Sequence, residues 1–158
     1  MATSRPKSDM RIQVRRTFRA PREKVFRAWV DQAGLEQWMC RDVPTHRVKY
    51  LELDAKTGGR YVMEVTDGAT GDLYVGRGTF LEVTRPEKLV FTWAWQKRQP
   101  DGSLAHFESE TQVTVEFWER GASTEVLLTH EHFAAEKAAK ETETGWKGCF
   151  DALELFLE

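Results

Sequence analysis

Two histidines near the end of one predicted strand have the spacing that first suggests chemistry. His130 and His132 lie two positions apart in "THEHF", and alternate residues of a strand face the same side. Two imidazoles on one face could bind zinc, but a catalytic zinc needs a third protein ligand. The other histidines, His46 and His106, fall in or near predicted loops. We therefore predict no metal and no cofactor. We expect His130 at the inner wall, bonded to a ligand or a buried carbonyl, and His132 at the rim.

Acid–base chemistry would need carboxylates that converge on one space. Glu82 shares the parity of Phe80, so strict alternation turns its side chain inward, whereas a β-bulge would turn it outward. Glu116 and Glu119 fall beside outward positions or a turn. Only one inward acid is therefore predicted, and no catalytic residue is assigned.

A row of aromatic residues marks the stretch "KLVFTWAWQ", residues 88–96. Phe91, Trp93 and Trp95 stand at alternate positions and share one face of a strand. Two interpretations are open, a solid core and the wall of a pocket. The pocket is favoured because one helix cannot fill the inside of a strongly curved sheet.

The elements that must position these residues begin after a loose polar tail, residues 1–10. "RIQVRRTFRA" predicts a first strand, and Pro21 stands where a short helix can begin. A second short helix contains Leu35 and Trp38. Six strands are predicted after about Thr45, namely "HRVKYLELD", "RYVMEV", "LYVGRGTFLEV", "KLVFTWAWQ", "ETQVTVEFWE" and "STEVLLTHEHF".

The last segment predicts a long amphipathic helix over about Ala135–Leu157. Its apolar residues recur at steps of three and four, at Trp146, Cys149, Phe150, Leu153 and Leu157. That stripe must be buried, and the concave face of the sheet is the large surface left for it. We predict one α+β domain over residues 11–158, in which a curved antiparallel sheet of about seven strands wraps the C-terminal helix. Two short helices follow the first strand.

Composition limits the classes of function. The 158 residues carry 23 basic and 25 acidic side chains, a formal net charge of −2, which gives no electrostatic reason to expect nucleic acid or an acidic membrane as partner. No stretch is apolar for long enough to span a bilayer, and no signal peptide is evident. Cys40 and Cys149 form no metal-type pair, so we interpret both as free thiols and expect a cytoplasmic protein.

Several motifs together resemble a known family. They are "RTFRAPREKVFRAWVD", "LEQW", "GGRYVMEV", "GRGTFLEVTRPEKLVFTWAW", "TQVTVEF", "TEVLLTHEHF" and "GWKGCFDALELFL". Their order is similar to that of the START/Bet v 1-like (SRPBCC) helix-grip superfamily, and they resemble most the family of the activator of Hsp90 ATPase homologue. The resemblance implies a helix-grip fold and a small apolar molecule held between sheet and long helix. It carries no single activity with it.

Two departures from the family pattern concern the mouth of that pocket. After "EQW" the family often continues with an aromatic residue and Gly-Pro, whereas this chain has "MCRDVP". After "LTHE" the family often has Gly-Phe, and here His132 precedes Phe133. The mouth is therefore expected to differ from that of relatives.

The favoured function is a soluble binding module for a small apolar or aromatic molecule, as a monomer or a homodimer. One alternative is an enzyme of the cyclase or hydratase kind that uses His130 and Glu82. Another is a regulator of a chaperone ATPase, with an Hsp90-type chaperone as partner. The predicted ligand-binding residues are Trp38, Met63, Phe80, Phe91, Trp93, Trp95, Val113, Val115, Leu128, His130, Trp146 and Phe150.

Overall fold

The computed structural model describes residues 10–106 and 108–158. The tail expected over residues 1–10 lies, apart from Met10, outside the described residues. Along the chain the elements are β1 (Arg11–Phe18), α1 (Arg22–Ala28), α2 (Gln32–Trp38), β2 (His46–Leu53), β3 (Arg60–Asp67), β4 (Leu73–Thr84), β5 (Lys88–Arg98), β6 (Leu104–His106), β7 (Thr111–Arg120), β8 (Ser123–Glu131) and α3 (Glu136–Leu157). The predicted order of strand, two short helices, strands and one long helix is confirmed.

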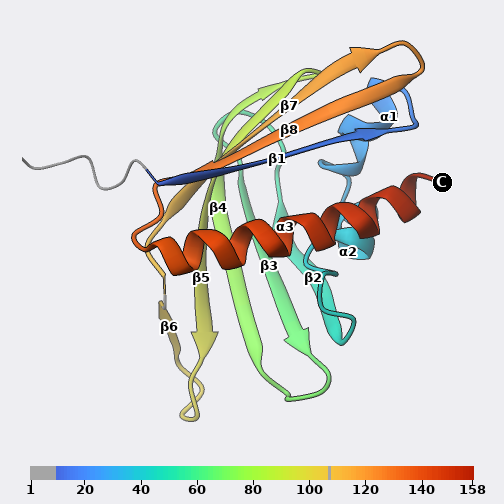
Figure 1. Cartoon of the computed structure of the whole chain (residues 1–158). Helices are drawn as coiled ribbons and strands as arrows, with labels where there is room; N and C mark the ends of the chain where they lie inside the picture. The colour runs from blue at the N-terminus through green and yellow to red at the C-terminus, as the bar shows by residue number, and fades with distance from the viewer. Residues whose placement is uncertain (1–9, 107) are drawn as a thin grey trace, which may run out of the picture.

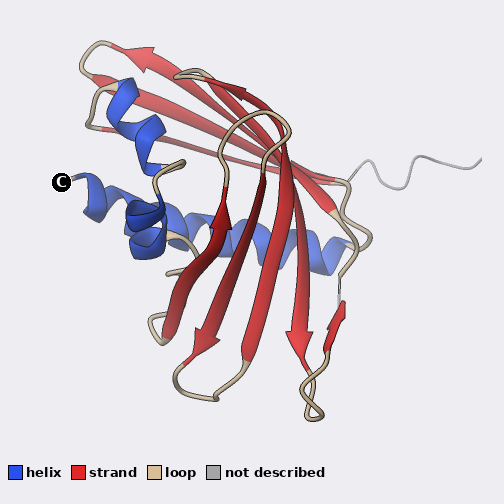
Figure 2. Ribbon diagram, turned by 180° about the vertical axis from the view of Figure 1, so that it is seen from behind, coloured by secondary structure: helices blue, strands red, loops and turns tan. Residues whose placement is uncertain are grey.

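The strands form one bent antiparallel sheet. Their order is β1-β8-β7-β5-β4-β3-β2, and β6 pairs with the end of β5. The described residues thus contain eight strands, where about seven were predicted. The additional strand, β6, has three residues, which is too short to show a periodic pattern. All three helices lie on the same face of the sheet (Figures 1 and 2).

The long helix follows its predicted bounds within one residue. The buried side chains of α3 include Trp146, Phe150, Leu153 and Leu157, so the predicted apolar stripe faces the sheet. Phe150 meets Phe18 of β1 edge-on, with 5.6 Å between ring centroids. In the described residues, no helix is both long enough and apolar enough to cross a membrane.

The two short helices close one end of the space between α3 and the sheet. Pro21 precedes α1 with a φ of −63°, the value that its ring imposes. The side chain of Asp31 caps α2 by accepting a hydrogen bond from the backbone N–H of Gly34. A side chain at Gly34 would begin 3.2 Å from the ring of Phe156 in α3. Glycine therefore lets α2 approach α3 closely near its C-terminal end (Figure 1).

The core at this closed end is tightly filled. The indole of Trp29, between α1 and α2, lies 4.7 Å from Trp38, 5.9 Å from Trp146 and 6.1 Å from Phe117, centroid to centroid. The space that remains among Trp29 and the neighbouring aromatic side chains is about 20 Å³, which holds one water molecule and no larger guest. Between α3 and the sheet, room for a ligand must therefore lie toward the N-terminal end of α3.

Candidate functional site

A cavity of about 330 Å³ opens between the first half of α3 and the sheet. This volume is within the range of small-molecule pockets. The described residues that line it are Met39, Cys40, Asp42, His46, Val65, Tyr74, Trp93, Trp95, Glu108, Ala138, Glu141, Thr142, Gly145, Trp146 and Cys149. The cavity thus joins strands β3, β4 and β5, the segment between α2 and β2, and one face of α3.

Three indoles form the apolar wall. Trp93 and Trp95 come from β5 and Trp146 from α3. The ring of Trp93 lies 5.5 Å from that of Trp95, edge to face, and 5.3 Å from that of Trp146. Such contacts between aromatic rings hold each ring in a defined orientation. These ring contacts therefore join the sheet to the helix along the apolar wall.

A glycine in the neighbouring strand sets the position of one indole. Gly76 of β4 pairs with Trp95 of β5, and a Cβ at Gly76 would lie 3.0 Å from the Trp95 ring and 2.9 Å from the Met63 methyl group. The ring of Trp95 therefore covers the bare backbone of Gly76, as bulky cross-strand neighbours of glycine do. A larger residue at this position would displace the Trp95 indole or the Met63 side chain.

His130 is completely buried and links Trp146 of the aromatic wall to Thr111 of β7 through hydrogen bonds. Its Nδ1 accepts a hydrogen bond from Nε1 of Trp146, at 3.0 Å. Its Nε2 therefore carries the proton and donates to Oγ1 of Thr111, at 2.7 Å. The Thr111 hydroxyl donates in turn to the carbonyl oxygen of Trp93, at 3.2 Å. This chain of bonds fixes the indole of Trp146 and the backbone of Trp93, two of the three tryptophans that line the cavity.

The imidazole of His130 stays neutral in this environment. Burial removes water from its charged form and lowers its pKa to about 3. Both nitrogens already have protein partners, and His130 is not among the residues that line the cavity. Its geometry is that of a structural group. Its predicted role as a ligand contact stays a prediction.

Carboxylates stand at the mouth of the cavity. Glu108, in the segment before β7, and Glu141, on α3, both line it. Burial raises the pKa of Glu108, and the nearby negative charge of Glu141 raises it further. Like charges disfavour each other's ionised form, and these two carboxylates line the same cavity.

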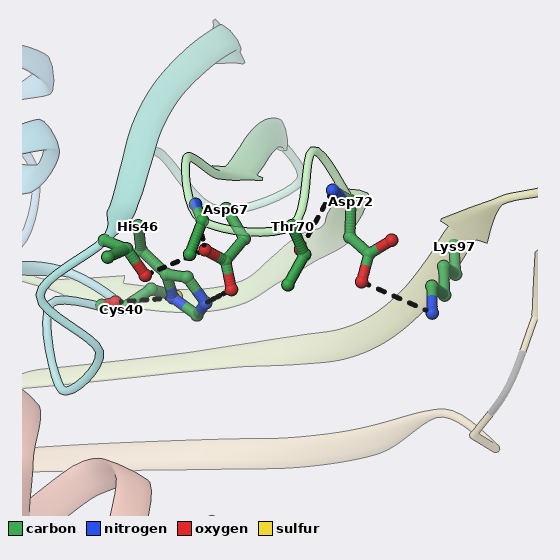
Figure 3. A network of polar contacts seen from close by, with 8 residues as sticks. Cys40, His46, Asp67, Thr70, Asp72 and Lys97 are labelled. Carbon is green, nitrogen blue, oxygen red and sulfur yellow. Dashed lines mark hydrogen bonds and ion pairs between the residues drawn. The ribbon is translucent and has the colours of Figure 1, made fainter.

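A network of polar contacts includes the cavity residues Cys40 and His46 (Figure 3). Nδ1 of His46 donates to the carbonyl oxygen of Cys40, at 3.1 Å, and its Nε2 lies 3.9 Å from the Asp67 carboxylate. The backbone N–H of Ala69 and the hydroxyl of Thr45 donate to that carboxylate and lower the pKa of Asp67. These bonds hold the segment between α2 and β2, in which Cys40 has a left-handed φ of 59°.

The same segment packs directly on α3. The Cys149 thiol donates to Oδ1 of Asp42, with 3.7 Å between the two atoms, and a Cβ at Gly148 would lie 2.5 Å from the Asp42 Cβ. Glycine at position 148 thus permits the close approach. Burial raises the pKa of Cys149 to about 12 and that of Cys40 well above its usual value. Both therefore remain protonated thiols at neutral pH, which are poor nucleophiles.

Comparison with known protein families gives a match over residues 19–158, to the model described as "Activator of Hsp90 ATPase homolog 1-like protein". This chain belongs to that family. The resemblance predicted from the sequence motifs is confirmed. A comparison with curated proteins gives no match.

Solved structures show the same fold as this AHSA1-like chain. Protein CV1439 from Chromobacterium violaceum is 23% identical, with a TM-score of 0.80 over 94% of this chain and 96% of that one. A protein from Arthrobacter aurescens is 20% identical, with a TM-score of 0.79 over 93% and 85%. The AHSA1-like protein from Aeromonas hydrophila is 22% identical, with a TM-score of 0.73 over 93% and 91%. The predicted helix-grip fold is confirmed.

The predicted ligand-binding residues of the AHSA1-like chain divide into three groups. Trp93, Trp95 and Trp146 line the cavity. Phe80 and Phe91, together with Trp93, border the space of about 20 Å³. The others are buried in the core and line neither space, namely Trp38, Met63, Val113, Val115, Leu128, His130 and Phe150.

The β-bulge that would turn Glu82 outward is present. The β4–β5 register shifts between Phe80 and Glu82, so Glu82 pairs with Val90, whereas Phe80 pairs with the inward Phe91. Its carboxylate accepts from the hydroxyl of Thr84 and lies 3.6 Å from Nζ of Lys88. The inward position given by strict alternation is therefore wrong, and Glu82 lies outside the cavity.

His132 is exposed and lies just beyond the end of β8 with a left-handed φ of 75°. The alternation that put it on the same face as His130 therefore stops at Glu131. Within residues 10–106 and 108–158, no group of three or more His, Cys, Asp or Glu side chains could hold a metal ion.

Sequence reasoning missed the polar lining of the cavity. Glu108 lies in an irregular segment, where no period places its side chain. On α3 a signal was present, because the apolar stripe continues toward the N-terminus with smaller and polar residues on one face. These residues, at steps of one and three, are Ala138, Glu141, Thr142 and Gly145.

Proposed function

We propose that this chain is a binding module that holds a small, largely apolar molecule with an aromatic part in the cavity beside α3. The observation that carries the proposal is a volume of about 330 Å³ walled by the indoles of Trp93, Trp95 and Trp146. Burial of an aromatic ligand against these rings supplies affinity through the hydrophobic effect and through ring–ring contacts.

The geometry favours binding over the alternative of catalysis. His130 has both nitrogens engaged and a pKa near 3, which suits neither a general acid nor a general base at neutral pH. Glu82 faces away from the cavity. Glu108 has a raised pKa, but the described cavity offers it no imidazole, hydroxyl or thiol partner within hydrogen-bond distance.

The chaperone-regulator alternative needs a binding surface outside the cavity, usually a contiguous exposed apolar patch. The large apolar side chains that are exposed among the described residues come from six positions on β2, β4, β6, β7 and α3. They are Leu51, Leu81, Leu104, Trp118, Leu155 and Phe156. Since these positions are spread over five elements, they favour this alternative less than the cavity favours ligand binding.

Titration with a neutral environment-sensitive dye tests the proposal. N-phenyl-1-naphthylamine should bind the native protein, gain fluorescence and quench tryptophan emission. Trp95→Ala should weaken this binding roughly tenfold, because an indole contact with an aromatic ligand contributes about 1 kcal/mol beyond area burial. The variant should still unfold cooperatively, since Trp95 is only partly buried.

Trp118→Ala is the matched control. Trp118 is 46% exposed on β7 and is not among the cavity residues, so dye affinity should stay within twofold of that of the unmodified protein. Absence of dye uptake by native protein would contradict the proposal, as would equal weakening by the two substitutions.

A further inference from the structure

The charged groups around the cavity are almost all of one sign. Three carboxylates line it, from Asp42, Glu108 and Glu141. The described lining residues include no Lys or Arg, and His46 is their one basic side chain. Because the chain as a whole is nearly neutral, with a formal charge of −2, this concentration of negative charge is local to the opening.

Two of these carboxylates are not neutralised by the protein. Among the described residues, no Lys or Arg nitrogen lies within 4.0 Å of the Glu108 or Glu141 side-chain oxygens. Asp42 differs, because its carboxylate already accepts from the Cys149 thiol. An unpaired carboxylate that loses water is costly. Glu108 is partly buried and Glu141 is exposed, so Glu108 gains most from a positive group placed beside it.

Two lysines that are close in sequence to lining residues have carboxylate partners of their own. Nζ of Lys97 lies 3.7 Å from the Asp72 carboxylate and 5.6 Å from the centre of the Tyr74 ring. Nζ of Lys140, on α3, lies 3.8 Å from the Glu136 carboxylate. Both lysines therefore pair with carboxylates other than Glu108 and Glu141.

The aromatic wall favours the same sign of charge. The face of an indole carries a negative electrostatic potential and attracts cations within about 6 Å of the ring, tryptophan most strongly. Trp93, Trp95 and Trp146 surround the cavity. A positive group in the cavity therefore meets tryptophans as well as carboxylates.

We propose that the cavity selects organic cations, meaning a protonated amine or a quaternary ammonium attached to an aromatic or apolar body. The ammonium would lie between Glu108 and Glu141, and the body against the three indoles. This inference rests on the proposed binding function and names its ligand class.

The titration behaviour of Glu108 agrees with this geometry. Its pKa is raised first by burial and then by Glu141, which means that the negative charge on Glu108 is held at a cost. A bound cation acts against this shift, because opposite charge nearby favours the ionised carboxylate.

Three probes that share a 1-naphthyl group test the inference by isothermal titration calorimetry at pH 7.5. They are 1-naphthylmethylammonium, 1-naphthylmethanol and 1-naphthoate, which carry positive, zero and negative charge. The ammonium should bind at least tenfold more tightly than the alcohol, and the carboxylate more weakly than either. Raising the salt concentration should reduce the preference for the cation and leave the affinity for the alcohol unchanged.

Substitutions assign the preference to the two carboxylates. Glu108→Gln and Glu141→Gln should each reduce the ammonium-to-alcohol affinity ratio severalfold, and the double variant should abolish the preference. Glu154→Gln is the control. It removes one negative charge from the same helix, thirteen residues beyond Glu141 and outside the cavity, so it should leave the ratio within twofold.

The outcomes separate the two proposals. If none of the three probes binds the unmodified protein, the binding function itself fails. If the alcohol binds and the ammonium binds no better, the binding function stands and the selectivity for cations is wrong. A preference that persists in the double variant would likewise overturn the role given to Glu108 and Glu141.

Discussion

At the scale of single residues, His130 shows how a residue with catalytic chemistry becomes structural. Its sequence context, on the inner face of a strand, predicted a polar group at the wall of the cavity. The structure supplies two partners that no local pattern reveals, Trp146 from α3 and Thr111 from β7. Such long-range pairing depends on tertiary packing, so the face of His130 could be predicted from sequence and its partners could not.

The pH dependence of stability should report this buried imidazole. In the unfolded chain a histidine takes up a proton near pH 6.5, whereas burial lowers the pKa of His130 in the folded protein to about 3. Between these values the unfolded state binds more protons, so stability falls as the pH decreases from about 6.5 toward 3. From pH 7 to pH 4.5 the contribution of His130 should fall by about 2–3 kcal/mol.

His130→Gln provides the comparison for that measurement. An amide can accept from Trp146 and donate to Thr111 but does not titrate. Urea unfolding of both proteins at several pH values should give a steeper loss of stability on the acid side for the unmodified protein. Equal slopes for the two proteins would show that His130 is not held neutral in the folded state.

At the scale of elements, periodicity predicted much of the fold because each pattern follows directly from backbone geometry. Apolar residues at steps of three and four predicted α3, and alternating aromatic residues predicted the row on one face of β5. Alternation failed where the backbone departs from a regular strand, at the bulge beside Glu82 and at the left-handed His132. The cavity rim was missed for the same reason, because Glu108 and the segment between α2 and β2 lie in irregular backbone.

Two leucines of α3 test how the helix is anchored to the sheet. Leu153 is completely buried, whereas Leu155, two residues later, is 70% exposed. Leu153→Ala should reduce the free energy of unfolding by about 2–5 kcal/mol, through lost burial and the cavity left behind. Leu155→Ala should change it by less than about 0.5 kcal/mol. Comparable losses in urea denaturation would show that α3 does not bury the face described here.

At the scale of the whole molecule, the space between α3 and the sheet is divided along the helix. Near α1 and α2 the indole of Trp29 and its aromatic neighbours leave about 20 Å³, whereas near the start of α3 about 330 Å³ remains. Trp93 borders both spaces. One end of the molecule therefore provides a packed core, and the other contains the cavity that we propose as the binding site.

This division predicts where a bound ligand changes local motion. Hydrogen exchange through local opening slows where the open form loses contact with a ligand. With the naphthalene probe that binds most tightly, present at about 100 times its dissociation constant, amides of residues 138–149 and 39–46 should exchange up to roughly 100-fold more slowly.

The β7–β8 turn at Arg120–Ser123 serves as the internal control, because it lies on different elements from those that line the cavity. Amides there that exchange by local opening should keep their rates. Amides that exchange only through global unfolding should slow everywhere by a common factor, since the ligand binds the folded state alone. Slowing at the β7–β8 turn equal to that on α3, or no slowing of residues 138–149, would mean that the probe binds elsewhere and that the open end of the molecule is not its site.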